Sequence, residues 1–273
     1  MQATNLWKGS TKVGHIRLGH LPKSRVWREV VALLDRQPED IPGIAAAVLD
    51  ASAEALERTT TIESASRAFL ILLQLAQASE RGDLVGELRR SGVEVSAESS
   101  LLGTLADIGG LVRGATPSGV LNDNYADFAS LALRRALLET VGAQGPSLFG
   151  STVDQLQAGF RRFSGGEAFG RLTRLFFGDF IARSLHSAVD RELSNHVGGE
   201  GAFGDVGESR AFSDALDRYA RETAAIVQRF ATEWYAKNRW QKHQQLGARH
   251  SRAFSAVALK KLRSDLAFAR APA

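Results

Sequence analysis

The sequence near the C-terminus alternates positive charges with aromatic rings. Positions 234 to 243 read Trp-Tyr-Ala-Lys-Asn-Arg-Trp-Gln-Lys-His. Lysine and arginine neutralise backbone phosphates and flat aromatic rings stack on unpaired bases, so the segment suits nucleic acid. Arginine and tryptophan are also favoured among the residues that dominate protein–protein binding. A third interpretation is structural, because a tryptophan near a helix end often closes a core and arginine stems pack over it.

The charge of the chain is distributed unevenly, with two basic ends around an acidic middle. Residues 1–28 carry six basic residues and residues 234–264 carry eight, and all but one of the 30 acidic residues lie between these two segments. The ends would form one surface for a protein partner or nucleic acid if they meet in space; alternatively, they dock on the chain's own acidic middle. The candidate contact residues are Trp7, Lys12, Arg17, Arg25, Lys237, Arg239, Trp240, Lys242 and Arg249.

Arg191 and His196 form a second candidate site, separated by four residues near the end of an expected helix. Histidine titrates near neutral pH, and arginine stabilises charge that develops on a phosphate. This six-residue string resembles the R-x4-6-H signature of HEPN-type ribonucleases, an all-helical family. The resemblance implies that His196 is the acid and base for the 2′-hydroxyl, that Arg191 supports the phosphate, and that dimerisation brings two motifs together. The structural alternative is a solvated helix face with His196 near the helix C-terminus, where the dipole favours a positive charge.

A third feature is a phenylalanine-rich run interleaved with arginines. Its members are Phe160, Phe163, Phe169, Phe176, Phe177 and Phe180, with Arg161, Arg162, Arg171 and Arg174. Such a helix can lie on an anionic membrane surface. We favour the alternative that it is the core helix of the second half of the chain.

No metal site and no cofactor are expected. His15 and His20 have no nearby carboxylate, which makes them a poor metal site. The glycines at positions 9 and 14 do not follow the order of a phosphate-binding loop. No pair of carboxylates recommends itself for acid–base chemistry, so Arg191 and His196 are the catalytic candidates and the function that we favour is non-catalytic.

Composition indicates a globular bacterial protein of the cytoplasm. Hydrophobic residues make up 44% of the 273 residues and charged residues 23%, the ordinary globular range. The absence of cysteine excludes disulfides and thiolate metal sites and fits a reducing compartment. No signal peptide is visible at the N-terminus, and no apolar run approaches the length of a membrane-spanning helix. The excess of arginine over lysine is typical of a GC-rich bacterial genome.

Apolar residues recur with helical spacing along most of the chain, and strand signals are almost absent. Helices are expected near 22–36, 42–56, 60–76, 83–90, 96–108, 122–141, 152–163, 167–197, 209–237 and 248–269. We therefore predict an all-α, roughly ten-helix globular bundle, either one domain or two closely packed halves. The predicted organisation is a basic extended arm at 1–21, an N-terminal half at 22–116 and a C-terminal half at 117–273.

The function that these patterns favour is that of a non-catalytic accessory or adaptor subunit in a bacterial multi-protein system. Its basic, tryptophan-containing ends would contact a protein partner or nucleic acid. A role in antiviral defence is a hypothesis that no particular residue carries. Two alternatives stay open, a HEPN-like ribonuclease that uses Arg191 and His196 and a peripheral membrane-associated protein. Homo-oligomerisation also stays open.

Overall fold

The computed structural model describes residues 25–96, 99–114, 124–142, 153–198, 201–242 and 245–268. In these ranges the chain is helical, without a strand beyond a single bridge between Val197 and Phe203, so the predicted all-α class is confirmed. The predicted arm at 1–21 and the predicted boundary between residues 116 and 117 lie outside the described residues. The helices are α1 (Arg25–Arg36), α2 (Ile41–Ala51), α3 (Ala53–Glu57), α4 (Thr59–Glu80), α5 (Leu84–Arg90), α6 (Leu101–Gly114), α7 (Asn124–Thr140), α8 (Val153–Arg161), α9 (Gly166–Leu193), α10 (Val206–Thr223), α11 (Ala225–Lys242) and α12 (Ala248–Phe268).

Two of the expected helices are each divided by a short break. The expected helix at 42–56 is interrupted at Ser52, between α2 and α3, and the expected helix at 209–237 is interrupted at Ala224, between α10 and α11. Near the second break, the Thr223 hydroxyl donates a hydrogen bond to the Tyr219 carbonyl oxygen at 2.9 Å. Such bonds to the carbonyl four residues back bend helices. Neither break has a glycine or proline, so periodicity alone predicted one continuous helix at each place.

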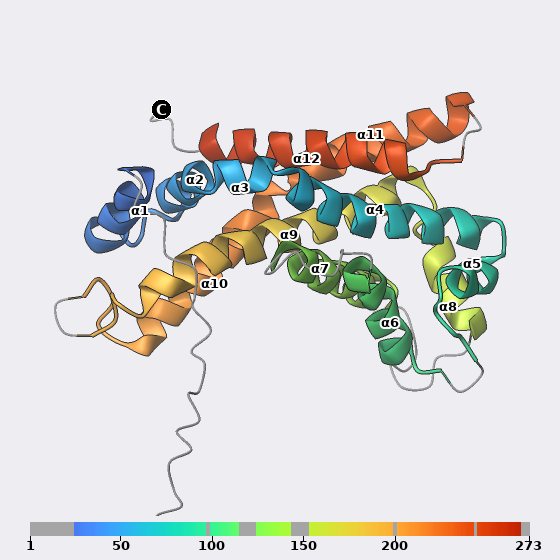
Figure 1. Cartoon of the computed structure of the whole chain (residues 1–273), viewed down its shortest axis with the longest axis horizontal. Helices are drawn as coiled ribbons and strands as arrows, with labels where there is room; N and C mark the ends of the chain where they lie inside the picture. Colours follow the sequence, from blue (N-terminus) through green and yellow to red (C-terminus); the bar gives the residue numbers. More distant parts are fainter. Residues whose placement is uncertain are drawn as a thin grey trace, which may run out of the picture.

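Helix α9 is the central element of the fold and crosses the molecule diagonally in Figure 1. It packs against α7 on one side and against α10 and α11 on another. Helices α4 and α12 lie side by side above it in this view and run antiparallel, because Gln77 near the end of α4 bonds to Leu246 just before α12 begins. One contiguous hydrophobic cluster includes buried residues from α1 through α12.

Glycines on α9 let α10 and α11 approach it closely. A Cβ atom built on Gly170 would lie 2.9 Å from the Gln228 carbonyl oxygen, and one built on Gly178 would lie 3.3 Å from the Arg221 Cα. Both distances are shorter than ordinary van der Waals contact, so a side chain at either position would push the neighbouring helix away. The close approach at Gly178 is what brings Arg221 against the middle of α9.

We expect Gly170→Ala to destabilise the protein by about 1–2 kcal/mol, because overpacking outweighs the gain in helix propensity. Gly110→Ala in α6 is the matched control. A Cβ atom there meets nothing within 4 Å, so only the propensity gain of about 0.5–1 kcal/mol remains and the protein should become more stable. Urea denaturation of both variants measures the two free energies. A stabilising Gly170→Ala would show that α11 does not approach α9 this closely.

An aromatic cluster joins four helices at the centre of the molecule. The Phe254 ring of α12 stacks on Phe69 of α4 at 4.3 Å between centroids and on Phe230 of α11 at 4.7 Å. It also contacts Trp234 at 4.9 Å and Phe177 of α9 at 5.9 Å. These rings fix the positions of α12, α4, α11 and α9 relative to one another.

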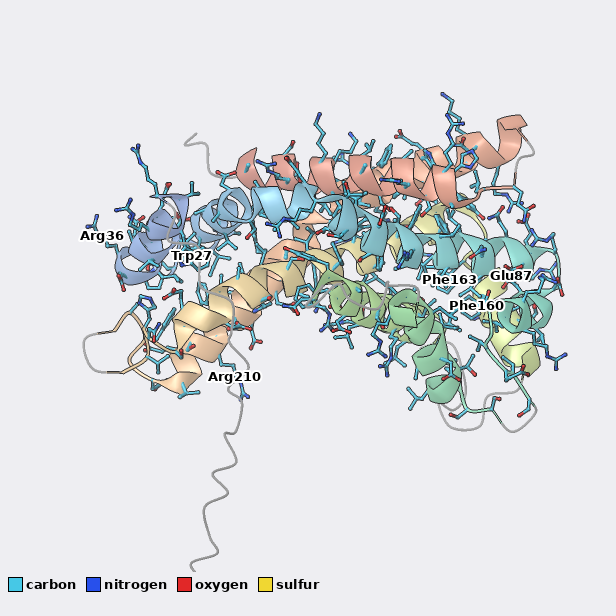
Figure 2. All side chains as sticks on the ribbon, in the orientation of Figure 1. Trp27, Arg36, Glu87, Phe160, Phe163 and Arg210 are labelled. Carbon is cyan, nitrogen blue, oxygen red and sulfur yellow. The ribbon has the colours of Figure 1, made fainter. Side chains whose placement is uncertain are left out.

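The phenylalanine-rich run belongs to this core, as predicted. Phe160, Phe163, Phe169, Phe176, Phe177 and Phe180 are all buried. Phe160 and Phe163 lie at the end of the molecule where α8 packs against α4 (Figure 2). Within the described residues, no helix combines the length and the apolar character needed to cross a bilayer.

Candidate functional site

The predicted contact residues are spread over the molecule. Lys237 and Arg239 lie on α11 and Arg249 lies at the start of α12, all near the connection between these two helices. Arg25 begins α1, at the opposite end of the long axis (Figure 1), so the structure does not bring it together with the others. Trp240 and Lys242 belong to α11, but their side chains lie outside the description, as do Trp7, Lys12 and Arg17 entirely.

The described aromatic residues of the C-terminal segment belong to the core. Tyr235 is 1% exposed and stacks on Phe169 at 4.2 Å, and burial raises the pKa of its phenol. Trp234 is half-buried and packs on Phe69 and Phe254. For these two rings the structural interpretation therefore holds.

Several C-terminal arginines pair with glutamates of the acidic middle. The pairs are Arg239 with Glu80, Arg252 with Glu63 and Arg263 with Glu57. These ion pairs connect α11 and α12 to α4 and to the end of α3. They therefore hold the two basic helices against the rest of the protein. Burial lowers the pKa of Arg239. The expectation that basic segments dock on the chain's own acids holds for these side chains.

Other cations of the same two helices remain exposed. We call Arg229 and Lys237 on α11, together with Arg249 and Lys260 on α12, the hairpin cations. In the part of the chain that the structure describes, these four side chains have no carboxylate partner. Lys237 and Arg249 belong to the predicted contact residues, whereas Arg229 and Lys260 were not among them. All four side chains stay available to a ligand.

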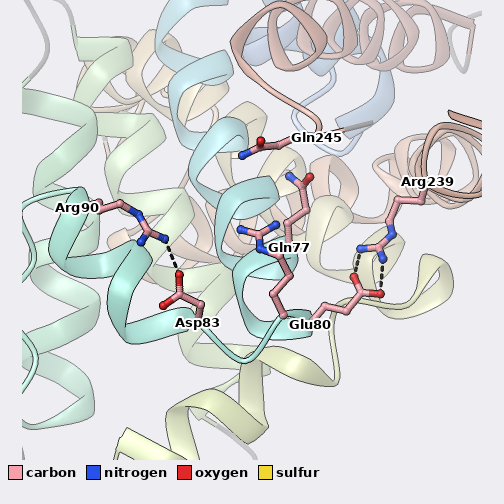
Figure 3. A pocket seen from close by; sticks show the side chains of 7 residues that line it. Gln77, Glu80, Asp83, Arg90, Arg239 and Gln245 are labelled. Carbon is pink, nitrogen blue, oxygen red and sulfur yellow. Dashed lines mark hydrogen bonds and ion pairs between the residues drawn. The ribbon is translucent and has the colours of Figure 1, made fainter. Parts of the chain in front are cut away.

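A polar cavity of about 590 Å³ opens at the same end of the molecule (Figure 3). Its lining residues are Gln77, Glu80, Arg81, Asp83, Arg90, Arg239 and Gln245. Arg90 donates a hydrogen bond to Asp83 at 2.7 Å, which lowers the pKa of that carboxyl group. Arg239 forms an ion pair with Glu80. Two of its cations are thus already neutralised, which weakens the cavity as an anion site.

Gln77 is a residue of this region that the sequence analysis missed. Its amide nitrogen donates to the Leu246 carbonyl oxygen at 3.2 Å, and its amide oxygen accepts from the Leu246 nitrogen at 3.0 Å. The side chain thereby fixes the connection between α11 and α12 on α4. The available signal was that Gln74 and Gln77 are the two polar residues in the otherwise apolar stretch from Ala68 to Ala78.

His196 is 7% exposed and held between two carboxylates. Its Nδ1 atom lies 2.6 Å from Asp35 Oδ1, and its Nε2 atom lies 3.9 Å from Glu192 Oε2. Glu192 also accepts a hydrogen bond from the Trp27 indole at 3.2 Å. The histidine thus helps to fasten α1 to the end of α9. Arg191 lies in the last turns of α9, and its side chain is outside the described part.

The most concentrated set of charges surrounds Asp179 on α9, which the sequence analysis did not single out. This aspartate is 2% exposed and accepts hydrogen bonds from Arg135 of α7 at 3.1 Å, Arg183 of α9 at 2.6 Å and Arg221 of α10 at 2.9 Å. Burial alone would lower the pKa of Arg135, but its bond to Glu139 and the charge of Asp179 outweigh this and raise it. The only sequence signal was one acid within an apolar run from Phe176 to Ile181.

Comparisons of the chain with protein-family models, with curated proteins and with solved structures found no match. Within the described ranges, no group of three or more histidine, aspartate and glutamate side chains is arranged to hold a metal ion.

Proposed function

We propose that the chain is a helical accessory protein that acts by binding, and that its hairpin cations contact the phosphates of nucleic acid. The supporting observation is that Arg229, Lys237, Arg249 and Lys260 remain exposed without a carboxylate partner in the described part, whereas neighbouring arginines are neutralised. Unpaired cations on a surface attract the phosphate backbone and release its counterions.

The distribution of rings favours nucleic acid over an acidic protein as the partner. Protein interfaces rely on aromatic anchors at their centre, and lysine is depleted there. Trp234 and Tyr235 pack in the core instead of standing on the surface. Arg249 and Lys260 are about 16 Å apart along α12 at the rise of an α-helix, a spacing that reaches phosphates on separate nucleotides.

The proposal also includes the setting that the sequence suggests. We place the protein in the bacterial cytoplasm as a subunit of a larger assembly, with antiviral defence as one such setting. The cysteine-free, arginine-rich composition supports this placement. In this view the protein holds nucleic acid for a partner that carries the chemistry.

Fluorescence anisotropy with a labelled DNA duplex tests the proposal. We expect the affinity to fall steeply as salt rises, and the triple variant Lys237→Gln, Arg249→Gln and Lys260→Gln to bind more weakly. The slope of the logarithm of affinity against the logarithm of salt should decrease by up to about 0.9 for each lost phosphate contact.

The matched control removes three exposed arginines elsewhere, in the variant Arg28→Gln, Arg36→Gln and Arg210→Gln. Arg36 and Arg210 lie at the far end of the molecule (Figure 2). This control should leave the salt slope unchanged. Equal loss in both variants would indicate attraction by net charge alone, and a triple variant that binds like the unmodified protein would overturn the proposal.

A further inference from the structure

A smaller cavity of about 260 Å³ lies over α9, with α7 on one side and α10 and α11 on the other. Its lining residues are Arg135, Glu139, Arg171, Arg174, Leu175, Arg221 and Gln228. Four guanidinium groups therefore surround this space with a single carboxylate. It is separate from the hairpin cations, none of which lines it.

The arginines of this cavity divide into two kinds. Arg135 and Arg221 are held in place by Asp179, so their remaining N–H groups are fixed in direction. Arg174 reaches only the Gln228 amide oxygen, at 3.5 Å, and Arg171 is exposed without a carboxylate partner among the described residues. The Nε atom of Arg221 is buried with no hydrogen-bond partner in the described part.

Asp179 does not neutralise the charges of Arg171 and Arg174. Asp179 already has three arginine partners, and neither of these two residues contacts it. They lie three residues apart on one helix, where like charges repel and destabilise the fold. An anion bound between them would remove this repulsion. Fixed arginines bind phosphate well because their planar N–H groups match its oxygens in pairs.

We propose that this cavity binds the phosphate group of a small phosphorylated molecule. Its volume is below that of pockets which enclose a whole small-molecule ligand, so it suits the phosphate end alone. A neighbouring cavity of about 380 Å³ shares Arg135 and Arg221 with it and is also lined by His186, Ser187, Asp190 and Asp217. The remainder of the ligand extends into this second cavity, where these polar groups can bond hydroxyls.

Isothermal titration calorimetry with ribose 5-phosphate, inorganic phosphate and ribose tests the inference. Ribose 5-phosphate should bind at a single site and ribose should not. The variant Arg171→Gln/Arg174→Gln should weaken ribose 5-phosphate binding by about tenfold or more. The control variant Arg210→Gln/Arg218→Gln removes two exposed arginines outside the cavity and should bind ribose 5-phosphate as the unmodified protein does.

Thermal unfolding, first in phosphate-free buffer and then with added phosphate, is a second test of this site. Without phosphate, Arg171→Gln/Arg174→Gln should raise Tm, because the repulsion is removed, and phosphate should then add less stability than it adds to the unmodified protein. Absence of binding by both phosphate probes, or equal binding by the double variant, would overturn the site. Inorganic phosphate binding as tightly as the ester would support the phosphate site and overturn the extension into the second cavity. A loss of DNA affinity in the same variant would overturn the small-molecule ligand.

Discussion

Asp179→Asn is expected to lower the free energy of unfolding by about 3 kcal/mol. The substitution removes the buried charge that faces Arg135, Arg183 and Arg221. Breaking a buried ion pair on one side costs about 3–5 kcal/mol, and the lower end applies because these arginines are partly exposed and water screens them. Chemical denaturation in urea at neutral pH measures the change in midpoint at constant slope.

Asp214→Asn provides the comparison, because Asp214 is an exposed acid of α10 without a described partner. Its effect should stay within about 0.5 kcal/mol, as for surface substitutions in general. Similar free energies of unfolding for the two variants would mean that the three arginines are satisfied by water and not by Asp179.

Phe254→Ala should cost about 4 kcal/mol, the range found when a fully buried phenylalanine is truncated. Phe254 is 1% exposed and contacts rings from three other helices. Truncation of the Phe254 side chain leaves a cavity between Phe69 and Phe230, and both rings lose their stacking partner. Calorimetric unfolding, in which Tm and the enthalpy are compared with those of the unmodified protein, measures the loss.

Val257→Ala on the same helix is the control for this prediction. Val257 is 41% exposed, so its truncation should change the free energy of unfolding by less than about 0.5 kcal/mol. Phe254→Leu should fall between the two, because leucine keeps part of the apolar contact. A loss for Phe254→Ala no larger than that for Val257→Ala would contradict the position of α12 on the aromatic cluster.

Helical periodicity was sufficient to predict the class of the fold and the places of most helices. The apolar spacing of the long stretch after Gly166 predicted α9 closely, because phenylalanine, leucine, isoleucine and valine recur along it at helical intervals. The breaks at Ser52 and Ala224 were not predictable in this way, since they depend on hydrogen bonds and packing and not on a glycine or proline.

The candidate site was less predictable than the fold. Charge counting located the basic C-terminal segment but did not reveal which arginines the glutamates of α3 and α4 neutralise, because that depends on how α12 lies along α4. The arginines around Asp179 come from helices far apart in sequence. Their meeting depends on the crossing of α7, α9 and α10, which hydrophobic periodicity does not specify.

The contact between Phe69 and Phe254 has a consequence for biosynthesis. The neighbouring bond from the Ser251 hydroxyl to the Ser66 carbonyl oxygen already joins positions 185 residues apart. At translation rates of about 5–20 residues per second, the apolar face of α4 waits on the order of 10–40 s for its covering helix. During this interval the nascent chain exposes the part of the α4 surface that α12 covers in the folded protein. Ribosome-bound chains that end before α12 should remain protease-sensitive throughout α4.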